Sequence, residues 1–557
     1  MRKNIKIVAT TFFCLFLALT ARVAYIQCIN GEKLSVMAEA QYSHKGNINE
    51  LNYMILDDEG KSLLKYNEKY KIVIDTVSFK RNNNVTPMEE LYAFNYILKN
   101  YNKDYDVVKD LKNQKEGKLY YEVDEDTYKN ISELKAIRGI YSYKYNSLDK
   151  NNSWNICNML TNIKNKDGEL KDRDSLEGDI KEYTSNNEEP TISFSKDNLG
   201  EITEGVYNIP KDNVNIKMTL NKDMIEKIKT VLDNDKYKNY AQIGVALCES
   251  TTGKVKALTQ KDDKKPNIML GSATENGYSP GSIFKLIVLE AALNEGIVSL
   301  DDQYTCTYNP KFPCKTGHGN LTIEQGLIRS CNNTFVEIGN KLGGEKIIKY
   351  AMDQGFFTKT LNFYGENEAK GDYLASDLNR GGTTNISIGQ NMRIAPIQAL
   401  GMINTIINKG NYVKPYIISS LEDNSFNIIK TFSPEIKKEV IKASVASTMK
   451  SELTKVVKDP NGTGKGAYIK DLDMGGKTGT ATRMEPKKDS EGNIVKDQNG
   501  NNLMEKYYDG WFAGYYKFKG QTYSLVVFVE NIKDEEAGGT TAAPIFKEIV
   551  EKLIDNK

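Results

Sequence analysis

The stretch YSPGSIFKLIVLEAAL, residues 278–293, places Ser282 three residues before Lys285 at the start of a mostly apolar run. A helix that is apolar on nearly every side is normally buried, and a buried lysine is costly unless it is paired or neutral. Because burial lowers the pKa of a lysine, Lys285 could stay neutral and accept the proton of Ser282, which shares its helix face. The stretch therefore predicts a buried helix that begins at an activated serine nucleophile.

The start of this helix has its own signals. We expect Ser279 to cap the helix and Pro280 to occupy its first position. Ser282 then lies in the first turn, where free backbone N–H groups favour a developing negative charge. The chain has only two histidines, His44 and His318, so the sequence offers few candidates for the histidine of a Ser-His-Asp triad.

Two later motifs carry further polar groups. Ser330-Cys331-Asn332 follows TIEQGLI (322–328), whose Thr322 and Gln325 resemble a capping box. A loop between two helices would there present a hydroxyl and an amide together. The stretch MGGKTGTATRM (474–484) contains Lys477-Thr478-Gly479-Thr480, in which glycine allows a ligand backbone to approach closely and the lysine and threonines can hold a carboxylate.

In this order, S-x-x-K, S-x-N and K-T-G resemble the motif triplet of the penicilloyl-serine transferases. The chain is identified from them as similar to class B penicillin-binding proteins, which have one N-terminal anchor, a non-catalytic pedestal and a transpeptidase domain. Three further segments, 250–258, 387–399 and 509–515, also resemble the sequences of this family, so the resemblance covers about 216–557. The resemblance implies a peptidoglycan D,D-transpeptidase that is a target of β-lactams and takes part in cell-wall biogenesis.

The resemblance also implies a role for each motif residue. Ser282 would attack the D-Ala–D-Ala bond of a stem peptide with Lys285 as base, and Ser330 would relay a proton to the departing D-Ala. Asn332 would hold the substrate amide, and Lys477 would polarise the site. Thr478 and Thr480, either side of Gly479, would bind the terminal carboxylate. The N–H groups of Ser282 and Thr480 would form the oxyanion hole.

Two other functions share these motifs. A serine β-lactamase must hydrolyse its acyl-enzyme, but the stretch ASDLN (375–379) lacks the glutamate of the class A enzymes, and the class D kind would have valine at Asn332. A membrane-anchored β-lactam-sensing receptor would need a cytoplasmic output module, and only about six residues precede the apolar run. The first half also lacks carboxylate motifs for a glycosyltransferase, so we expect a membrane glycosyltransferase as a separate partner.

The N-terminus predicts a membrane anchor. Arg2, Lys3 and Lys6 precede an apolar run from Ile7 that continues past Arg22 to 26, which reaches the roughly 20 residues that a bilayer needs. The small-residue rule for signal-peptide cleavage fails here. We expect an uncleaved single-pass anchor in a bacterial cell membrane, with its basic end in the cytoplasm and the catalytic domain outside. The net charge of +1 offers no field that would recruit nucleic acid.

The expected fold class is α/β. Residues 216–557 would form the penicilloyl-serine transferase fold, an antiparallel sheet covered by helices. The signals are a helix at 221–234, hairpins at 241–260 and 509–531, and a terminal helix at 543–554. An elongated, non-catalytic α+β pedestal or dimerisation-like domain would occupy 29–215, with strands at 70–77 and 118–124. Residues 1–28 would form the cytoplasmic tip and the anchor.

A last cluster predicts a structural zinc site. CTYNPKFPCKTGHG puts Cys306, Cys314 and His318 in one short loop, and thiolate plus imidazole is a ligand set that zinc prefers. Asp302 is the candidate fourth ligand, with Cys331 or water as alternatives. The alternative interpretations of these residues are a Cys306–Cys314 disulfide and two buried free thiols. Catalysis itself requires no cofactor.

Overall fold

The computed structural model describes residues 2–28, 43–114, 116–195, 205–308, 314, 317–378, 383–487, 489 and 493–555. Its contacts divide the chain into two units. Unit 1 comprises residues 1–52, 66–149 and 187–213, and unit 2 comprises residues 53–65, 150–186 and 214–557. The sequence predicted a single boundary after residue 215, whereas the two units alternate along the chain. One reason is that β2 (Ile55–Leu56) pairs in parallel with β8 (Asn215–Met218) of unit 2.

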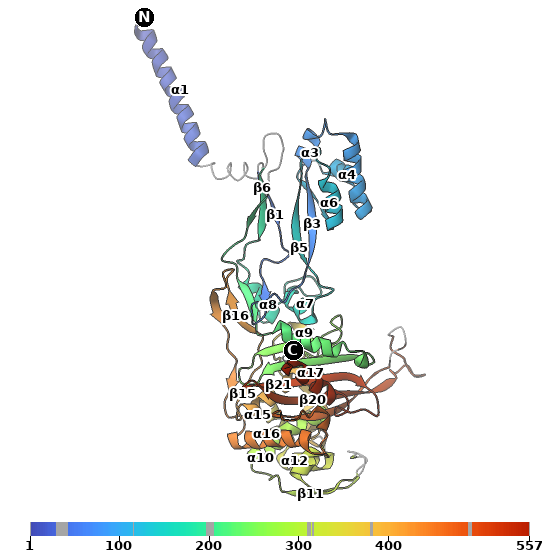
Figure 1. The fold of residues 1–557 in the computed structure, drawn as a ribbon. Helices are drawn as coiled ribbons and strands as arrows, with labels where there is room; N and C mark the ends of the chain where they lie inside the picture. Colours follow the sequence, from blue (N-terminus) through green and yellow to red (C-terminus); the bar gives the residue numbers. More distant parts are fainter. Residues whose placement is uncertain are drawn as a thin grey trace. The chain divides into compact units, whose positions relative to one another are not determined.

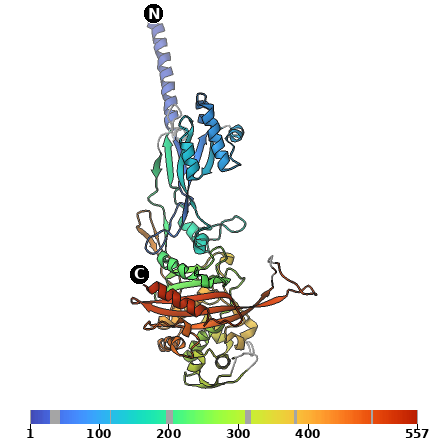
Figure 2. The same cartoon turned by 45° about the vertical axis from the view of Figure 1, so that its right-hand side comes forward.

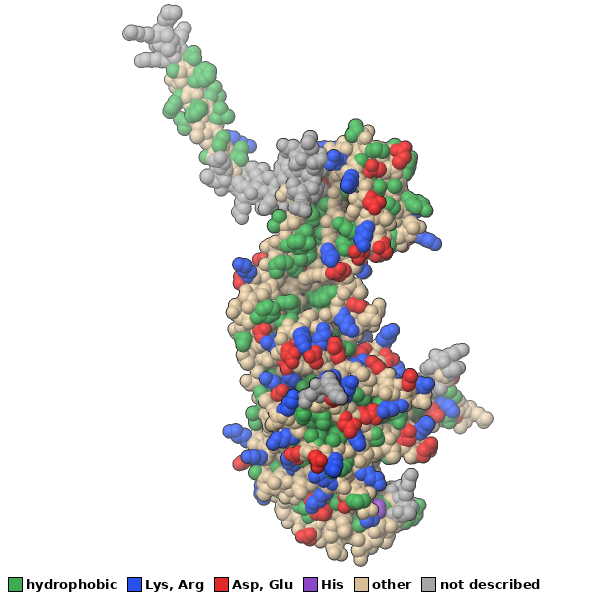
Figure 3. All heavy atoms as spheres, in the orientation of Figure 1, with side chains coloured by type: hydrophobic (Ala, Val, Ile, Leu, Met, Phe, Trp, Pro, Cys, Tyr) green, Lys and Arg blue, Asp and Glu red, His purple; other side chains and the backbone are tan. Residues whose placement is uncertain are grey.

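Helix α1 (Arg2–Cys28) is the N-terminal apolar helix (Figure 1). Its segment Ile7–Ile26 is long and apolar enough to cross a membrane, and none of it is buried by the rest of the protein. Figure 3 shows hydrophobic side chains along the described part of this helix. The N-terminal helix therefore has the length and composition that the predicted membrane anchor requires.

Unit 1 is built on two small sheets with helices against one of them. Sheet β4-β3-β5 and sheet β1-β6-β7 are both antiparallel. Their bounds are β1 Ser43–Asn47, β3 Tyr66–Asp75, β4 Lys118–Val123, β5 Ile140–Leu148, β6 Thr191–Ser195 and β7 Val206–Asn208. The helices are α3 Thr76–Asn82, α4 Met88–Tyr101, α5 Val107–Asn113 and α6 Glu125–Ser132. The strands predicted at 70–77 and 118–124 are β3 and β4, so the α+β character is confirmed.

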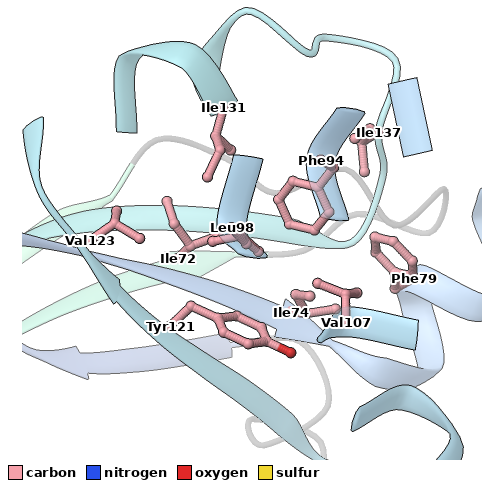
Figure 4. Packing of buried hydrophobic residues seen from close by; sticks show 10 residues of the cluster. All are labelled: Ile72, Ile74, Phe79, Phe94, Leu98, Val107, Tyr121, Val123, Ile131 and Ile137. Atoms are coloured by element: carbon pink, nitrogen blue, oxygen red, sulfur yellow. The ribbon is translucent and has the colours of Figure 1, made fainter. Parts of the chain in front are cut away.

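The core of unit 1 lies between sheet β4-β3-β5 and helices α4 and α6 (Figure 4). Ile72 and Ile74 of β3 point to this side of the sheet, and Phe94 and Leu98 of α4 pack against them. The alternation along YKIVID places Val73 on the opposite face, where it packs with Tyr141, Tyr143, Ile192 and Phe194.

Unit 2 is organised around a five-stranded antiparallel sheet in the order β10-β9-β21-β20-β19. The strands are β9 Gln242–Glu249, β10 Val255–Gln260, β19 Met474–Pro486, β20 Met504–Phe518 and β21 Gln521–Ile532. Both predicted hairpins are present. Strands β19 and β20 extend past the sheet as a long hairpin (Figures 1 and 2).

Helices cover both faces of this sheet, which confirms the predicted fold class. One face carries α9 (Lys222–Leu232) and α17 (Ala542–Ile554), where the ring of Phe546 packs at a tilt against that of Phe512 of β20. The opposite face carries α15 (Ala399–Ile407) and α16 (Ala443–Lys458), where Thr454 and Tyr515 share a hydrogen bond of 2.9 Å. The predicted cap of α9 is correct, since the Asn221 side chain accepts from Met224 N.

Smaller elements complete unit 2. The helices are α7 Asn155–Thr161, α8 Leu176–Tyr183, α10 Lys285–Asn294, α11 Ile323–Ile328, α12 Asn332–Leu342, α13 Gly344–Met352 and α14 Thr383–Ile386. The short 3₁₀ helices are η1 Asp235–Tyr237, η2 Gly281–Phe284, η3 Gly365–Asn367, η4 Ala375–Leu378, η5 Pro396–Gln398 and η6 Lys465–Ala467. The remaining strands are β11 Gln303–Cys306, β12 Gly319–Thr322, β13 Asp372–Tyr373, β14 Met392–Arg393, β15 Tyr412–Val413, β16 Ile418–Glu422, β17 Ile428–Thr431 and β18 Ile436–Lys437.

Candidate active site

The opening stretch forms η2 followed directly by α10, so Ser282 lies in a 3₁₀ turn and Lys285 is the first residue of the α-helix. Nearly all of α10 is buried, as its apolar sequence predicts, and Lys285 is fully buried while Ser282 is half-buried. The predicted Ser279 cap is wrong: no side chain caps η2, and the Ser279 hydroxyl instead donates to Met392 O at 3.0 Å. Pro280 stands at the N-cap of this 3₁₀ turn, so the first helical position predicted for it is also wrong.

Two glycines set the position of the nucleophile. Gly281 has a φ of 55°, and a Cβ there would lie 2.5 Å from Thr480 O of β19. Gly389 has a φ of 73°, and its Cβ would lie 2.1 Å from Gly281 O. Gly281 N also donates to Gly389 O at 3.0 Å. The turn that carries Ser282 is thus wedged between β19 and the 386–389 segment, and only glycine fits both contacts.

The S-x-N motif lies in the loop between α11 and α12, as predicted. The capping box of Thr322 and Gln325 is present at the start of α11. Ser330 has a φ of 55°, an uncommon conformation for a residue other than glycine. Asn332 begins α12. This geometry turns the Ser330 hydroxyl and the Asn332 amide toward the same lysine.

Lys285 is that lysine. Its Nζ lies 2.7 Å from Ser330 O, 2.6 Å from Asn332 Oδ1 and 3.3 Å from Ser330 Oγ. Burial lowers the pKa of Lys285 to about 7. A neutral amine has two N–H bonds, and the two carbonyl oxygens can accept both, so the nitrogen lone pair remains available to take a proton.

The K-T-G motif lies on β19. Lys477 is fully buried, and its Nζ lies 2.9 Å from Ser330 Oγ and 3.0 Å from Thr478 O. Burial, followed by repulsion from Lys285, holds the pKa of Lys477 well below its usual range. Thr478 donates to Thr463 Oγ1 at 2.9 Å, and Thr480 Oγ1 accepts from Gly538 N at 3.1 Å. The structure therefore brings all three motifs to one polar centre around Ser330.

Sequence reasoning missed several residues that build this centre. Thr463, which supports Thr478, and Gly389, which contacts Gly281, belong to no recognised spacing. Phe335 of α12 presents its ring to Lys285 Nζ, with the nitrogen 5.4 Å from the ring centre. Only the three-dimensional contacts reveal these roles, although Gly389 does lie within the family-like piece 387–399. Of the stretch weighed against the class A β-lactamases, Asn379 lies outside the described residues.

The predicted metal ligands are only partly brought together. Cys306, Cys314, His318 and Cys331 have ligand atoms that all lie within 4.8 Å of one another. Asp302, the candidate fourth ligand, is not part of this group: it is exposed, and its carboxylate accepts from Ser299 N at 3.0 Å. Strand β11 separates Cys306 from Asp302, and the fourth member of the group is Cys331, one of the two alternatives considered for the fourth ligand. These cysteines are free thiols, so the Cys306–Cys314 disulfide is absent. Within this loop, residues 309–313 and 315–316 lie outside the described part.

Comparison with known proteins agrees with this centre. The family model for the penicillin binding protein transpeptidase domain matches residues 243–551. Stage V sporulation protein D of Bacillus subtilis (strain 168) is 27% identical over 587 residues, which cover 99% of this chain and 85% of that protein. Peptidoglycan D,D-transpeptidase PbpA of Mycolicibacterium smegmatis is 25% identical over 339 residues, 54% of this chain and 65% of that protein.

Solved structures share the fold. Penicillin Binding Protein 2X from Streptococcus thermophilus aligns with a TM-score of 0.63 at 18% identity, covering 92% of this chain and 80% of that one. A peptidoglycan synthetase from Bifidobacterium adolescentis aligns with a TM-score of 0.61 at 19% identity, covering 92% and 96%. Fold and motifs define a serine acyltransferase. Since the family model matches more than half of its length, the chain belongs to the penicillin-binding protein transpeptidase family, and the predicted class B membership is confirmed.

Proposed function

We propose that this chain cross-links peptidoglycan stem peptides through an acyl-enzyme on Ser282. The observation that carries this proposal is the hydroxyl of Ser330, which lies 3.3 Å from Lys285 Nζ and 2.9 Å from Lys477 Nζ. Three motifs far apart in the sequence thus share one proton-transfer network beside the half-buried serine. The same network accounts for acylation by β-lactams, whose strained amide mimics the scissile bond.

The proposed reaction can be followed through its proton transfers. Lys285 takes the hydroxyl proton of Ser282, and the serine oxygen attacks the carbonyl carbon of the D-Ala–D-Ala bond. The proton passes through Ser330 to the leaving nitrogen as the C–N bond breaks, and Lys477 donates to Ser330 throughout. Thr478 and Thr480 hold the terminal carboxylate. An amine of a second stem peptide then attacks the ester and releases Ser282 with the new amide bond formed.

The direct test is covalent labelling. Full-length protein is treated with labelled penicillin, digested and mapped by mass spectrometry. We expect the label on Ser282, complete loss in Ser282→Ala, and normal labelling in Ser299→Ala, which removes an exposed serine just beyond α10. The adduct should outlast one turnover many times over. Rapid recovery of free enzyme would instead favour a β-lactamase, and a label on any other serine would refute the assignment.

A structural zinc ion at the Cys/His cluster is part of the proposal. Tetrahedral zinc with Zn–S of about 2.3 Å and Zn–N of about 2.0 Å separates its ligand atoms by roughly 3.5 to 3.8 Å. Cys306 Sγ lies 3.4 Å from His318 Nδ1, and Cys314 Sγ lies 3.8 Å from Cys331 Sγ. Three sulfurs and one imidazole nitrogen suit this metal.

The membrane arrangement and the partner are inferred from the N-terminal helix. We place unit 2 outside the cell, because the basic residues Arg2, Lys3 and Lys6 precede the apolar segment. A single-span transpeptidase needs a polymerase that supplies glycan strands, so the partner is a membrane glycosyltransferase. Replacing residues 1–28 with an unrelated anchor should weaken co-purification of the glycosyltransferase. If the two proteins still associate equally well, the anchor does not contribute to their interface.

A further inference from the structure

The hairpin of β16 and β17 in unit 2 has an unusual turn (β16 is labelled in Figure 1). Asp423 Oδ1 accepts from Ser425 N and from Asn427 N, both at 2.8 Å. The fourth residue of this turn, Phe426, has a φ of 63° and is 60% exposed. A bulky side chain in the left-handed region is a conformational outlier, and here its ring points to solvent.

Three other described turns of this chain have the same hydrogen bonds but carry glycine at the fourth position. In each of them the side-chain oxygen of the first residue accepts from the backbone N–H of the third and fifth residues. These turns are 57–61, 165–169 and 497–501, with Gly60, Gly168 and Gly500 at φ of 87°, 82° and 83°. A Cβ in this region costs free energy. Phe426 therefore carries a strain that glycine would relieve, and its exposed ring gains no burial in return.

The strand after this turn is a free edge. β17 is the end strand of the sheet β17-β16-β8-β2, and all four of its residues are exposed. Ile428 is 66% exposed and Ile429 is 54% exposed. An edge strand presents unpaired N–H and C=O groups to which another strand can bind. Residues 426–431 thus form an apolar edge, which we call the docking edge.

A pocket of 260 Å³ lies at the end of the docking edge, within unit 2. Phe432, the residue after β17, forms part of its wall. Most of the other apolar side chains of the wall come from α8, the 360–362 segment and the 415–418 segment: Leu176, Tyr183, Leu361, Pro415, Ile417 and Ile418. Lys430 Nζ lies 5.1 Å from the ring centre of Tyr183 and 4.8 Å from that of Phe432. An exposed ring and an apolar hollow therefore lie at the two ends of one short strand.

We propose that unit 2 binds a second copy of this chain through a two-fold, antiparallel pairing of β17 with β17, centred on Ile429. In this register Ile429 lies opposite Ile429 of the second copy, and Lys430 lies opposite Ile428. Continued to both ends, the register places Phe426 opposite Phe432, at the mouth of the second copy's pocket. A two-fold contact repeats each interaction, so both rings are buried and both edges are paired.

Self-pairing fits this surface better than a strand of an unrelated protein. The ring and the hollow that receives it belong to the same patch, which is the property that a two-fold interface requires. The register also keeps like charges apart, because Lys430 faces an isoleucine rather than Lys430 of the second copy. The inference concerns assembly and does not depend on the transpeptidase reaction, so penicillin labelling of Ser282 is unaffected by its failure.

The test is disulfide cross-linking of the full-length protein in membranes, read on a non-reducing gel. Ile429→Cys puts two thiols on the two-fold axis, where opposite Cα atoms fall in the range that a disulfide needs, so mild oxidation should give a covalent dimer. Thr431→Cys is the matched control on the same strand. Its two copies lie four residue spacings apart, about 14 Å, so it should form no more dimer than the wild type with its native cysteines. Adding Asn427→Cys, which lies opposite residue 431 in this register, should restore the dimer.

Phe426→Gly tests the ring. Because glycine relieves the strain, we expect an unchanged or higher melting temperature, together with about fivefold or greater loss of cross-linking in the Ile429→Cys background, the effect of removing an aromatic anchor. Asp471→Gly is the control for the backbone, since Asp471 is exposed and has the same φ of 63°. It should leave cross-linking unchanged.

Four results would overturn the inference. The first two are no covalent dimer of Ile429→Cys, and equal amounts from Ile429→Cys and Thr431→Cys, which excludes the two-fold register. The third is a disulfide between Ile429→Cys and a different membrane protein without the homodimer, which assigns the docking edge to another strand. The fourth is a lower melting temperature of Phe426→Gly, which shows that the ring stabilises its own chain.

Discussion

Arg483 and Asp509 form a buried ion pair across β19 and β20, with Arg483 Nε 2.9 Å from Asp509 Oδ2. Asp509 is 1% exposed, and its second oxygen accepts from Asn531 N of β21 at 3.1 Å. The pair thus ties three strands together just beyond the K-T-G motif. It also places the guanidinium beside Tyr278, four residues before Ser282.

Asp509 should make stability depend on pH. Its burial outweighs the attraction of Arg483 and raises its pKa to about 7, above the value of about 3.9 in an unfolded chain. The folded state therefore holds the proton more tightly, and the stability from this group is lost as pH rises from about 4 to 7. We expect the melting temperature of the wild type, measured relative to Asp509→Asn, to fall across this window. A constant difference would contradict the raised pKa.

Lys285 should set the pH dependence of acylation. The base must be neutral, and burial lowers its pKa to about 7, so the rate of penicillin acylation should rise about tenfold per pH unit below 7 and level off above it. Stopped-flow labelling between pH 5 and 9 measures this profile. Lys285→Arg keeps the charge but cannot lose its proton, so it should be inactive at every pH. A flat profile in the wild type would exclude Lys285 as the base.

The fold and the motif residues could be predicted because they depend on local patterns. The continuous apolar runs of β9, β21 and α10 each follow from short stretches of sequence. The wrong assignments concern relations across the chain. Asp302 is four residues from Cys306, but the extended β11 separates them, whereas Cys331 reaches the cluster from the start of α12. Sequence distance is a poor guide wherever a strand intervenes.

Ser279 shows a second limit of structure prediction from local sequence. A serine before Pro280 predicts a helix cap, but the turn at Gly281 is 3₁₀ and is fixed by its contact with Thr480, which lies about 200 residues away in the sequence. Tertiary packing therefore overrides the local signal. A pocket of 440 Å³ that includes Tyr278 and Ser279 in its wall was also missed, because its lining residues come from four separate segments of the chain.

Gly389→Ala should disrupt the site through a defined clash. The new Cβ would lie 2.1 Å from Gly281 O in a backbone with φ of 73°, so the turn that carries Ser282 must shift. We expect a lower melting temperature and slower acylation. Gly296→Ala is the matched control, because it has a φ of 68° but no atom within 4 Å. It carries the conformational strain without the clash, so it should lower stability slightly and leave acylation unchanged. Equal effects of both variants on acylation would show that strain alone is responsible.

The Cys/His cluster should couple metal content to catalysis, because Cys331 lies between Ser330 and Asn332 of the S-x-N motif. We expect about one zinc per chain by elemental analysis of the full-length protein. Chelation should lower the melting temperature and slow acylation of Ser282, since losing a ligand that binds only the folded state removes its stabilisation. Cys314→Ser should lose the metal.

Asp302→Ala is the control that separates this cluster from the ligand set expected from the sequence. Its carboxylate contacts Ser299 N and lies outside the four-residue group, so the variant should keep its zinc and its acylation rate. Loss of zinc in Asp302→Ala would restore aspartate as a ligand and remove Cys331 from that role. Metal-free protein of unchanged stability, or a disulfide between any two of the three cysteines in the peptide map, would exclude the zinc site, because a thiol that is oxidised cannot supply the thiolate that the metal requires.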